Sequence, residues 1–212
     1  MRRVFTAVLL LTGTLCLADG QPPDPARQRE IWNKAFSEKS YENPSEFLVA
    51  VSKDLKPGKA LDVGMGQGRN AIFLAQQGWD VTGVDISDVA IDQANARART
   101  LGVKITSVLQ DAFAYDFGAS KWDLIALVYV GVRPFVEHVR GALKPGGLVL
   151  VEGFHRESVP NSPQDNPVAF DTNELLKLFA GFRILRYEDV LGPLDYGRKP
   201  TGRVVRLLAQ KP

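Results

Sequence analysis

The residues best placed to do chemistry form a glycine-rich run at positions 61–70, which reads Leu-Asp-Val-Gly-Met-Gly-Gln-Gly-Arg-Asn. Its three glycines, Gly64, Gly66 and Gly68, alternate directly after an apolar stretch that predicts a short β-strand. In open parallel sheets, ligands bind at the carboxyl ends of strands, and glycines there let the backbone approach a ligand closely. By itself, such a run is equally consistent with a plain strand-to-helix turn.

Two further strand ends carry acidic residues that favour the ligand-binding interpretation. Asp85 ends the next predicted strand, about 20 residues after Gly64, where a carboxylate accepts both hydroxyl protons of a ribose. Ile86 follows it and is counted with the same site. Asp111 and Ala112 end the third strand, where a carboxylate and a backbone amide can read an adenine edge. The three strand ends together indicate a cofactor that contains adenosine.

The spacing of the glycines indicates which adenosine cofactor fits. A dinucleotide fingerprint requires G-x-G-x-x-G, but the sixth position from Gly64 is Arg69, and the third glycine comes one residue early at Gly68. A dinucleotide places its pyrophosphate on the N-terminus of the following helix. The observed spacing suits a cofactor without phosphate, such as S-adenosylmethionine. A nicotinamide-dependent oxidoreductase stays open only if Gly68 substitutes for the missing glycine.

An open parallel sheet must bring these residues together, and the chain from Pro57 onward has the matching pattern. Short apolar runs alternate with helical stretches, which is typical of an α/β sandwich with crossover helices. The expected strands are 60–63, 80–84, 103–109, 122–130, 148–153, 182–189 and 203–210, and the expected helices are 69–77, 87–101, 134–143 and 171–179. No helical pattern separates the last two strands, so they are expected to pair antiparallel. The predicted fold is an α/β, Rossmann-like three-layer sandwich with a seven-stranded, mostly parallel sheet and an antiparallel last strand.

Local signals mark where these elements begin and end. Ser87 is expected to be the N-cap of the second helix, and Gly102 is expected to end it. Asp171 and Glu174 have the spacing of a capping box at the start of the last helix. Residues 144–147, Lys-Pro-Gly-Gly, are expected to turn the chain into the fifth strand.

Together, these motifs resemble those of class I S-adenosylmethionine-dependent methyltransferases. The run at 61–68 is similar to the first motif of that family, and Val84-Asp85 is similar to the second. Residues 110–112 and 143–147 are similar to the third motif and to the turn before the fifth strand. The resemblance extends from about residue 31 to residue 210.

Within that family, three segments resemble the tellurite-resistance branch of small-molecule methyltransferases. These segments are 66–71, 80–85 and 168–171. Two positions depart from the branch. Met65 stands where the branch often has cysteine, and residues 192–195, Gly-Pro-Leu-Asp, lack the histidine of its Gly-Glu-Leu-His segment.

The resemblance implies S-adenosyl-L-methionine as the cofactor and a set of residues that hold it. Asp85 would hold the ribose, Asp111 the adenine amino group, and the three glycines the methionine portion. Asp62 would orient the loop or face the cofactor ammonium group. The expected cofactor-binding residues are Asp62, Gly64, Gly66, Gly68, Asn70, Asp85, Ile86, Asp111, Ala112, Val128 and Tyr129.

Several of these residues also fit a purely structural role. Asn70 is expected to cap the helix after the loop or to touch the cofactor, and for Arg69 a surface position is an equally good interpretation. Val128 and Tyr129 would pass under the transferable methyl group. No catalytic residue is assigned, because an anionic nucleophile needs no base; His155 is the only well-placed histidine if a base is required.

Composition argues against nucleic acid as the substrate. The chain has 212 residues, enough for one domain, with 26 Lys and Arg against 24 Asp and Glu. Without Arg2 and Arg3, which precede an apolar N-terminal run, the two totals are equal, so the bulk attraction to phosphates is missing. The expected substrate is therefore a small molecule, and nothing in the sequence indicates an oligomeric state.

The N-terminus has the layout of a secretory signal peptide. Arg2 and Arg3 precede an apolar run over 4–18, and a polar, proline-rich stretch follows. The run is shorter than the roughly 20 residues that span a bilayer, so the mature chain is not expected to insert stably. The predicted organisation is a signal peptide at 1–18, a linker with cap helices at 19–56, and a methyltransferase domain at 57–212. Export to the periplasm is expected; a cytoplasmic or membrane-tethered protein is the alternative.

Three less regular segments are candidates for substrate selection, and one alternative function stays open. Residues 31–41 could form a flap across the cofactor, and residues 155–167 and 191–202 are loops of the length that binding loops have. The alternative to an enzyme is a catalytically silent module that binds S-adenosylmethionine or S-adenosylhomocysteine.

Overall fold

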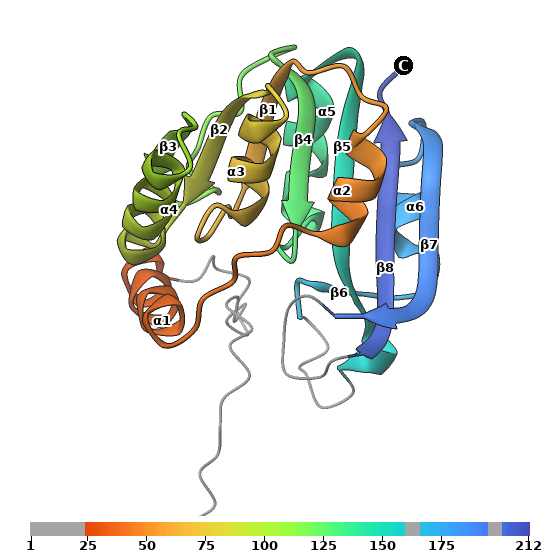
Figure 1. Cartoon of the computed structure of the whole chain (residues 1–212). Helices are drawn as coiled ribbons and strands as arrows, with labels where there is room; N and C mark the ends of the chain where they lie inside the picture. The colour runs from red at the N-terminus through yellow and green to blue at the C-terminus, as the bar shows by residue number, and fades with distance from the viewer. Residues whose placement is uncertain (1–23, 160–165, 195–200) are drawn as a thin grey trace, which may run out of the picture.

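The chain folds around a mixed sheet, and one of its central strands leads into the glycine-rich loop (Figure 1). The computed structural model describes residues 24–159, 166–194 and 201–212, so the signal-peptide prediction for 1–18 falls outside the described residues. The strands are β1 (Lys59–Val63), β2 (Asp80–Asp85), β3 (Thr106–Leu109), β4 (Trp122–Val128), β5 (Leu143–His155), β6 (Ala169–Phe170), β7 (Arg183–Pro193) and β8 (Thr201–Gln210). Their order is β3-β2-β1-β4-β5-β8-β7, with β6 paired to β5 beside this path.

The direction of the strands confirms the predicted sheet. Strand β1 pairs in parallel with β2 and β4, β2 with β3, and β4 with β5. Strand β8 runs antiparallel to both of its neighbours, β5 and β7. The carboxyl ends of the parallel strands therefore meet at one edge of the sheet, which is the lower edge in Figure 1 and is called the carboxyl edge below.

Two details of the sheet differ from the prediction. The eighth strand, β6, has only two residues, which pair in parallel with Phe154 and His155 at the end of β5. A pair of residues is too short for any alternating pattern, so β6 could not be predicted from the sequence. Strand β3 begins at Thr106 rather than at residue 103, and it pairs with β2 from Thr82 onward.

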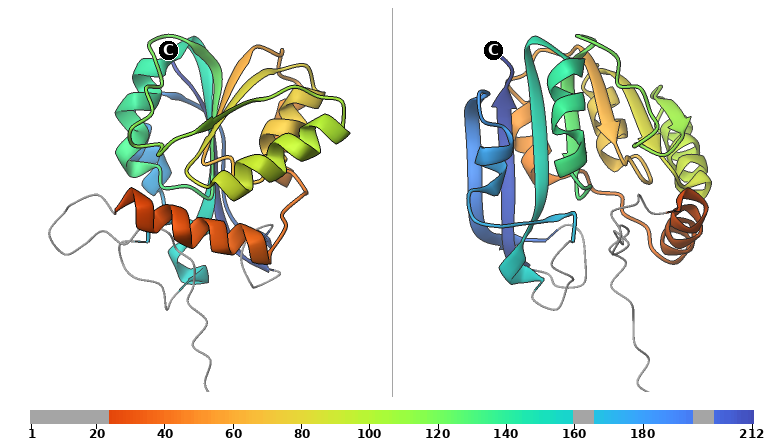
Figure 2. Two further views of the ribbon diagram at one scale, coloured as in Figure 1. Left: turned by 90° about the vertical axis from the view of Figure 1, so that its left-hand side faces the viewer. Right: turned by 180° about the vertical axis from the view of Figure 1, so that it is seen from behind.

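Helices cover both faces of the sheet, which makes the predicted three layers (Figure 2). The helices are α1 (Pro25–Glu38), α2 (Glu46–Ser52), α3 (Arg69–Gln76), α4 (Asp88–Thr100), α5 (Val136–Ala142) and α6 (Glu174–Leu178). On one face, α2, α3 and α4 enclose an apolar core that includes Phe47, Leu74 and Ile91. On the other face, α5 and α6 enclose a core that includes Val139 and Phe179. Helix α1 belongs to neither layer and crosses the carboxyl edge.

The predicted caps of α4 are confirmed, whereas α6 begins later than expected. The Ser87 hydroxyl accepts a hydrogen bond from the Ala90 amide (3.1 Å), and Gly102 lies beyond the helix with φ +68°. Glu174 accepts from the Asp171 amide (2.9 Å), which is half of the predicted capping box. The Asp171 carboxylate instead pairs with Arg156, so α6 starts at Glu174 rather than at 171.

The predicted turn at residues 144–147 is a bulge inside β5. Trp122 pairs with Leu143 and Leu124 with Leu148, so β5 carries extra residues against β4. Gly147 lies in the bulge, where an added Cβ would come within 2.9 Å of the Lys144 carbonyl oxygen and 3.0 Å of the Trp122 carbonyl oxygen. Only glycine fits between these two carbonyls. Residues 133–135 also form a short 3-10 turn ahead of α5 rather than part of a single helix from 134.

Among the described residues, none of the helices is both long and apolar enough to cross a membrane.

Candidate functional site

The glycine-rich loop joins β1 to α3 at the carboxyl edge and is fixed by backbone bonds to β2. The amides of Gly64 and Met65 both donate to the Val84 carbonyl, at 2.8 and 3.1 Å. Gly64, Gly66 and Gly68 have φ values of +67°, +52° and +73°, in the left-handed region that favours glycine. A Cβ at Gly64 would lie 2.9 Å from Val130, and one at Gly68 would lie 2.9 Å from Ala94.

Met65 fills space inside the sheet rather than facing a ligand. Its side chain is 4% exposed, and its Sδ lies only 2.0 Å from where a Cβ at Gly83 would be. Gly83 in β2 therefore makes room for Met65. The departure from cysteine at this position is a packing difference within the core.

Asp85 connects the loop to the start of α4. Its Oδ2 accepts from the Gly66 amide and its Oδ1 accepts from the Ser87 amide, both at 2.8 Å. The side chain is 7% exposed, and burial raises the pKa of its carboxyl. Hydrogen bonds from the backbone amides of Ser87, Gly66 and Ile86 act in the opposite direction and lower this pKa. Each carboxylate oxygen has a further lone pair, so hydroxyl donors can be added without breaking these bonds.

Asp62 in β1 is the most unusual group at this edge. It is 1% exposed, and its Oδ2 lacks a hydrogen-bond partner among the described residues. Burial raises the pKa of this carboxyl to about 7; the positive charge of Arg69 and the Ala71 amide lower it, and the charge of Asp85 raises it. A buried oxygen without a partner requires an explanation, and a donor or cation supplied by a ligand is one.

Arg69 and Asn70 anchor the chain that leads into α2. Asn70 accepts from the Ser45 amide through its Oδ1 (2.9 Å), and Arg69 donates from Nη1 to the Asn43 carbonyl (3.0 Å). Arg69 is 8% exposed, which excludes the surface position that was one interpretation of this residue. Asn70 does not cap α3, because the N-cap is Gly68 and it makes no side-chain capping bond.

The ends of β2 and β3 lie side by side, as their sequence motifs require. The Gln110 amide donates to the Asp85 carbonyl (3.0 Å), which joins the two strand ends directly. Asp111 is half-buried, and its Oδ1 accepts from the Phe113 amide (3.0 Å). Ile86 presents its carbonyl to Arg29 Nε of α1 (3.1 Å). Ala112 packs at the edge of the core beneath α5 and α6.

The end of β4 carries a strained tyrosine. Val128 is 8% exposed, and Tyr129 follows it with φ +55°, which is unfavourable for a bulky side chain. The Tyr129 amide donates to the Glu152 carbonyl (2.8 Å), and its ring lies 4.8 Å from the ring of Phe154. Contacts with β5 therefore hold Tyr129 in this conformation.

Sequence reasoning missed a buried charged network behind Tyr129. Glu152 is completely buried; its Oε1 accepts from Arg206 Nε (3.0 Å), and its Oε2 accepts from the Ser45 hydroxyl. Arg206 also donates to Glu188 (3.2 Å), so the network crosses β5, β8 and β7. One signal was present: Glu152 and Arg206 each interrupt an otherwise apolar strand. Their pairing depends on the register between β5 and β8, which sequence alone does not specify.

His155 is engaged at both ring nitrogens. Its Nδ1 accepts from the Glu157 amide (3.2 Å), and its Nε2 lies 3.1 Å from the Thr172 hydroxyl. The side chain is 4% exposed, and Asp189 Oδ2 lies 3.8 Å from Nε2. A histidine whose accepting nitrogen is already bonded is poorly prepared to take a proton from a substrate. His155 thus fixes the end of β5.

The expected flap lies across the site. Residues 31–38 belong to α1, and the segment that follows runs along α4 toward α2. Trp32 and Phe36 stack at 5.7 Å between ring centroids, and the Phe36 ring lies 3.0 Å from where a Cβ at Gly66 would be. The parts of the expected loops at 160–165 and 195–200 fall outside the described residues. Within the described part, no cluster of three or more His, Cys, Asp or Glu residues could hold a metal ion.

Comparison with known proteins identifies similarity in both sequence and fold. A family described as "Methyltransferase domain" matches residues 60–147. A protein of Haemophilus influenzae named "Probable S-adenosyl-L-methionine-dependent methyltransferase TehB" is 27% identical over 77% of this chain and 61% of the relative. "Probable thiol methyltransferase 2" of Arabidopsis thaliana is 29% identical over 70% of each chain. "Hemagglutinin 1" of Eikenella corrodens is 29% identical over 74% of this chain and 55% of the relative.

Two solved structures show the same fold. The structure of TehB from Haemophilus influenzae superposes with a TM-score of 0.69 at 24% identity, over 85% of this chain and 67% of that one. A structure described under "Conversion of a Disulfide Bond into a Thioacetal Group during Echinomycin Biosynthesis" also gives 0.69, at 20% identity, over 86% and 92%. In sequence, the chain spans less than two thirds of the TehB relative.

Proposed function

We propose that this chain is a class I, S-adenosyl-L-methionine-dependent methyltransferase related to TehB and that it methylates a small-molecule nucleophile; its residues 60–147 match the methyltransferase family, and its fold matches that of TehB. The observation that carries the proposal is the unpartnered oxygen of buried Asp62, two residues before the glycine loop. Asp85 lies nearby with lone pairs to spare. An adenosyl group with a cationic amino-acid end matches both carboxyls.

Different residues at the carboxyl edge would bind different parts of this cofactor. Asp85 would accept the ribose hydroxyls, and Asp62 would face the ammonium group or the donors around it. Asp111 would accept from the adenine amino group at the end of β3. The left-handed glycines leave the loop backbone open to the methionine portion. S-adenosyl-L-methionine supplies a methyl group on a sulfonium centre, which leaves as a neutral thioether.

The remaining task of the protein is to position the nucleophile in line with the methyl group. Alignment of reacting groups can supply roughly 7 to 11 kcal/mol of the barrier. Tyr129 and Val128 end the strand next to the loop, and the fixed conformation of Tyr129 gives that end a defined shape. Phe36 of α1 places an aromatic ring against the loop at Gly66, with Trp32 stacked on it, and aromatic faces stabilise cations by about 0.5 to 2 kcal/mol.

The environment of His155 favours an acceptor that needs no general base. With Nδ1 bonded to the Glu157 amide, this histidine has no accepting nitrogen to offer. A thiolate or another anionic nucleophile reacts without losing a proton. The relative in Arabidopsis is named as a thiol methyltransferase, which supports thiols as the first class of acceptor to test.

Calorimetry followed by methyl transfer tests the proposal. S-adenosylmethionine and S-adenosylhomocysteine are expected to bind, and NAD is expected not to bind. Transfer of a labelled methyl group is then measured onto thiols, halides, amines and carboxylates, with thiols expected to accept it. Binding without transfer to any acceptor would indicate a silent binding module, and tighter binding of NAD would contradict the cofactor assignment.

A further inference from the structure

Gln67, which lies between two glycines of the cofactor loop, is bonded to the N-terminal part of the chain. Its Nε2 lies 3.1 Å from the Lys39 carbonyl, 3.4 Å from the Phe36 carbonyl and 2.7 Å from Gln93 Oε1. Its Oε1 accepts from the Tyr41 amide at 2.6 Å. The side chain is 7% exposed, so these bonds are made away from water. The side-chain amide of Gln67 therefore bonds to residues 36–41, nearly thirty positions earlier in the chain.

The bonds from Gln67 fall at the C-terminal end of α1. The last carbonyls of a helix lack partners within the helix and need donors from elsewhere. Phe36 and Lys39 supply two such carbonyls, and the Gln67 amide group donates to both. Gln93 of α4 also donates to the Phe36 carbonyl (3.3 Å). Gln67 acts as the cap of α1, although it belongs to the loop that receives the cofactor.

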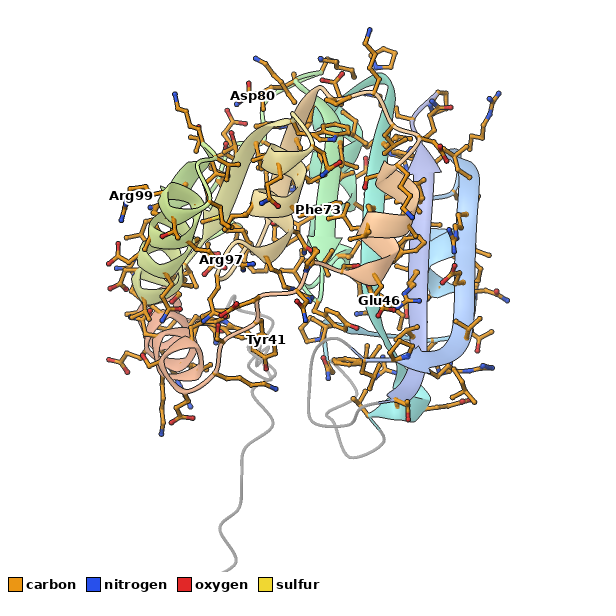
Figure 3. The ribbon with its side chains drawn as sticks, viewed as in Figure 1. Tyr41, Glu46, Phe73, Asp80, Arg97 and Arg99 are labelled. Atoms are coloured by element: carbon orange, nitrogen blue, oxygen red, sulfur yellow. The ribbon has the colours of Figure 1, made fainter. Side chains whose placement is uncertain are left out.

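Apolar packing gives α1 little other support. Gln28 is the one buried residue of α1, and its aromatic residues Trp32 and Phe36 are partly exposed. A hollow of about 590 Å³ is lined by residues 36–42, Gln67 and α4, and direct hydrogen bonds join this segment to α4, from Gln93 to the Phe36 carbonyl (3.3 Å) and from Arg97 to the Glu42 carbonyl (2.8 Å). Tyr41 and Arg97, two of the residues that line the hollow, are labelled in Figure 3. Polar bonds, rather than apolar burial, fasten the C-terminal end of α1.

The middle of α1 is also tied to the cofactor edge. Asn33 donates to Asp88 (2.8 Å) and accepts from the Ser87 hydroxyl (2.7 Å), and Arg29 donates to the Ile86 carbonyl (3.1 Å). These three partners directly follow Asp85. A ligand seated between the loop and the end of β2 would therefore be covered by α1, which has polar attachments at its middle and at its C-terminal end.

We propose that Gln67 is a positioning residue that fastens α1 over the cofactor loop and thereby sets how long the adenosyl product stays bound. The proposal rests on the function proposed above for the same site. Release of the product requires the C-terminal end of α1 to leave the loop, which breaks the bonds of Gln67. Elements held in this way open locally, without unfolding the sheet.

Hydrogen exchange of the unliganded full chain tests the attachment itself. In Gln67→Ala, the amides of residues 33–41 are expected to exchange at least tenfold faster, and those of β1 and β4 are expected to stay unchanged. Gln76→Ala, an exposed glutamine at the end of α3, is the matched control and should change neither region. Unchanged exchange in 33–41, or an equal increase throughout the sheet, would overturn the proposal.

Dissociation of S-adenosylhomocysteine, followed by stopped flow, tests the consequence. Gln67→Ala is expected to release it at least fivefold faster, with a smaller change in the association rate. Gln67→Glu keeps the acceptor for Tyr41 but places a carboxylate against two carbonyls, so it should behave like the alanine variant. Equal rates of S-adenosylhomocysteine release in wild type and Gln67→Ala would contradict the proposal. Absence of binding to the wild type would instead refute the proposed function, while the exchange result would still stand.

Discussion

At the level of single residues, Asp85 has an observed role in holding the glycine-rich loop and a predicted role in binding the ribose. Its oxygens hold the Gly66 and Ser87 amides, and the same oxygens are the predicted acceptors for ribose hydroxyls. Sequence position alone indicated the second role, because an acidic residue at the end of β2 belongs to a local motif. The first role became visible only with the loop folded, since it depends on the φ angles of the glycines.

Replacement of Asp85 by alanine is expected to weaken the binding of S-adenosylmethionine at least tenfold. This corresponds to about 1.4 kcal/mol, in line with the loss of charge-assisted hydrogen bonds. The measurement is calorimetric titration. Asp80→Ala is the matched control, because Asp80 begins the same strand at the opposite, exposed end (Figure 3). Unchanged affinity in Asp85→Ala, or an equal loss in the control, would contradict the ribose assignment.

Asp62 should make stability depend on pH in an unusual direction. Its pKa of about 7 lies above the ordinary 3.8, so between pH 4 and 7 the folded state holds a proton that the unfolded state has released. Its contribution to stability is complete below pH 4 and is lost as the pH rises toward 7. Asp62→Asn removes this dependence, so the free energy of unfolding of the variant relative to wild type should rise by up to roughly 4 kcal/mol over this range.

Urea unfolding at pH 4, 5.5 and 7 measures this difference. Asp80→Asn is the control, because it makes the same change of side chain at an exposed position. A flat difference for Asp62→Asn would mean that the carboxyl is ionised in the folded protein throughout, and that another group neutralises it.

At the level of elements, the pair Glu152 and Arg206 should stabilise the sheet only as a pair. Removal of one partner of a buried ion pair costs about 3 to 5 kcal/mol, because the other charge stays buried alone. Arg206→Leu is therefore expected to lower the free energy of unfolding by that amount, and the double variant with Glu152→Leu is expected to recover much of it. Urea unfolding of both variants gives the comparison.

A more exposed ion pair in the same sheet supplies the contrast. Lys144 and Asp123 lie 2.8 Å apart with 41% and 35% of their side chains exposed. Exposed pairs contribute at most about 1 kcal/mol, so Lys144→Ala should have a small effect. Equal losses for Arg206→Leu and Lys144→Ala would show that burial of Glu152 does not govern the energy of its pair.

The elements also show where sequence reasoning reaches its limit. Strand ends, Ser87 as a cap and Gly102 as a helix terminator could be predicted, because each depends on a few neighbouring residues. Strand β6 could not, because its two residues pair only after the chain around it has folded. The same holds for Gln67, whose bonding partners belong to the α1 region and to α4, more than 25 residues away in the chain.

At the level of the whole molecule, the sheet and α1 together determine how the protein responds to its cofactor. The sheet brings three strand ends to one edge, and α1 closes that edge from outside (Figure 2). The sheet was predictable from alternating patterns over most of the chain. A flap at residues 31–41 was also expected, but the polar contacts that hold α1 in place were not, because their partners lie far away in the chain.

Binding of the cofactor should stabilise this whole arrangement, and thermal unfolding measures the effect. A ligand at one hundred times its Kd raises the free energy of unfolding by about 2.7 kcal/mol, provided that it binds only the folded state. For a chain of this length, about 1 kcal/mol shifts Tm by roughly 2 to 4 °C, so S-adenosylhomocysteine at that excess should raise Tm by roughly 5 to 11 °C. NAD at the same concentration should leave Tm unchanged, because the loop lacks the dinucleotide spacing. A shift with NAD that equals the shift with S-adenosylhomocysteine would show that the edge recognises adenosine alone, and that the glycine spacing does not select the cofactor.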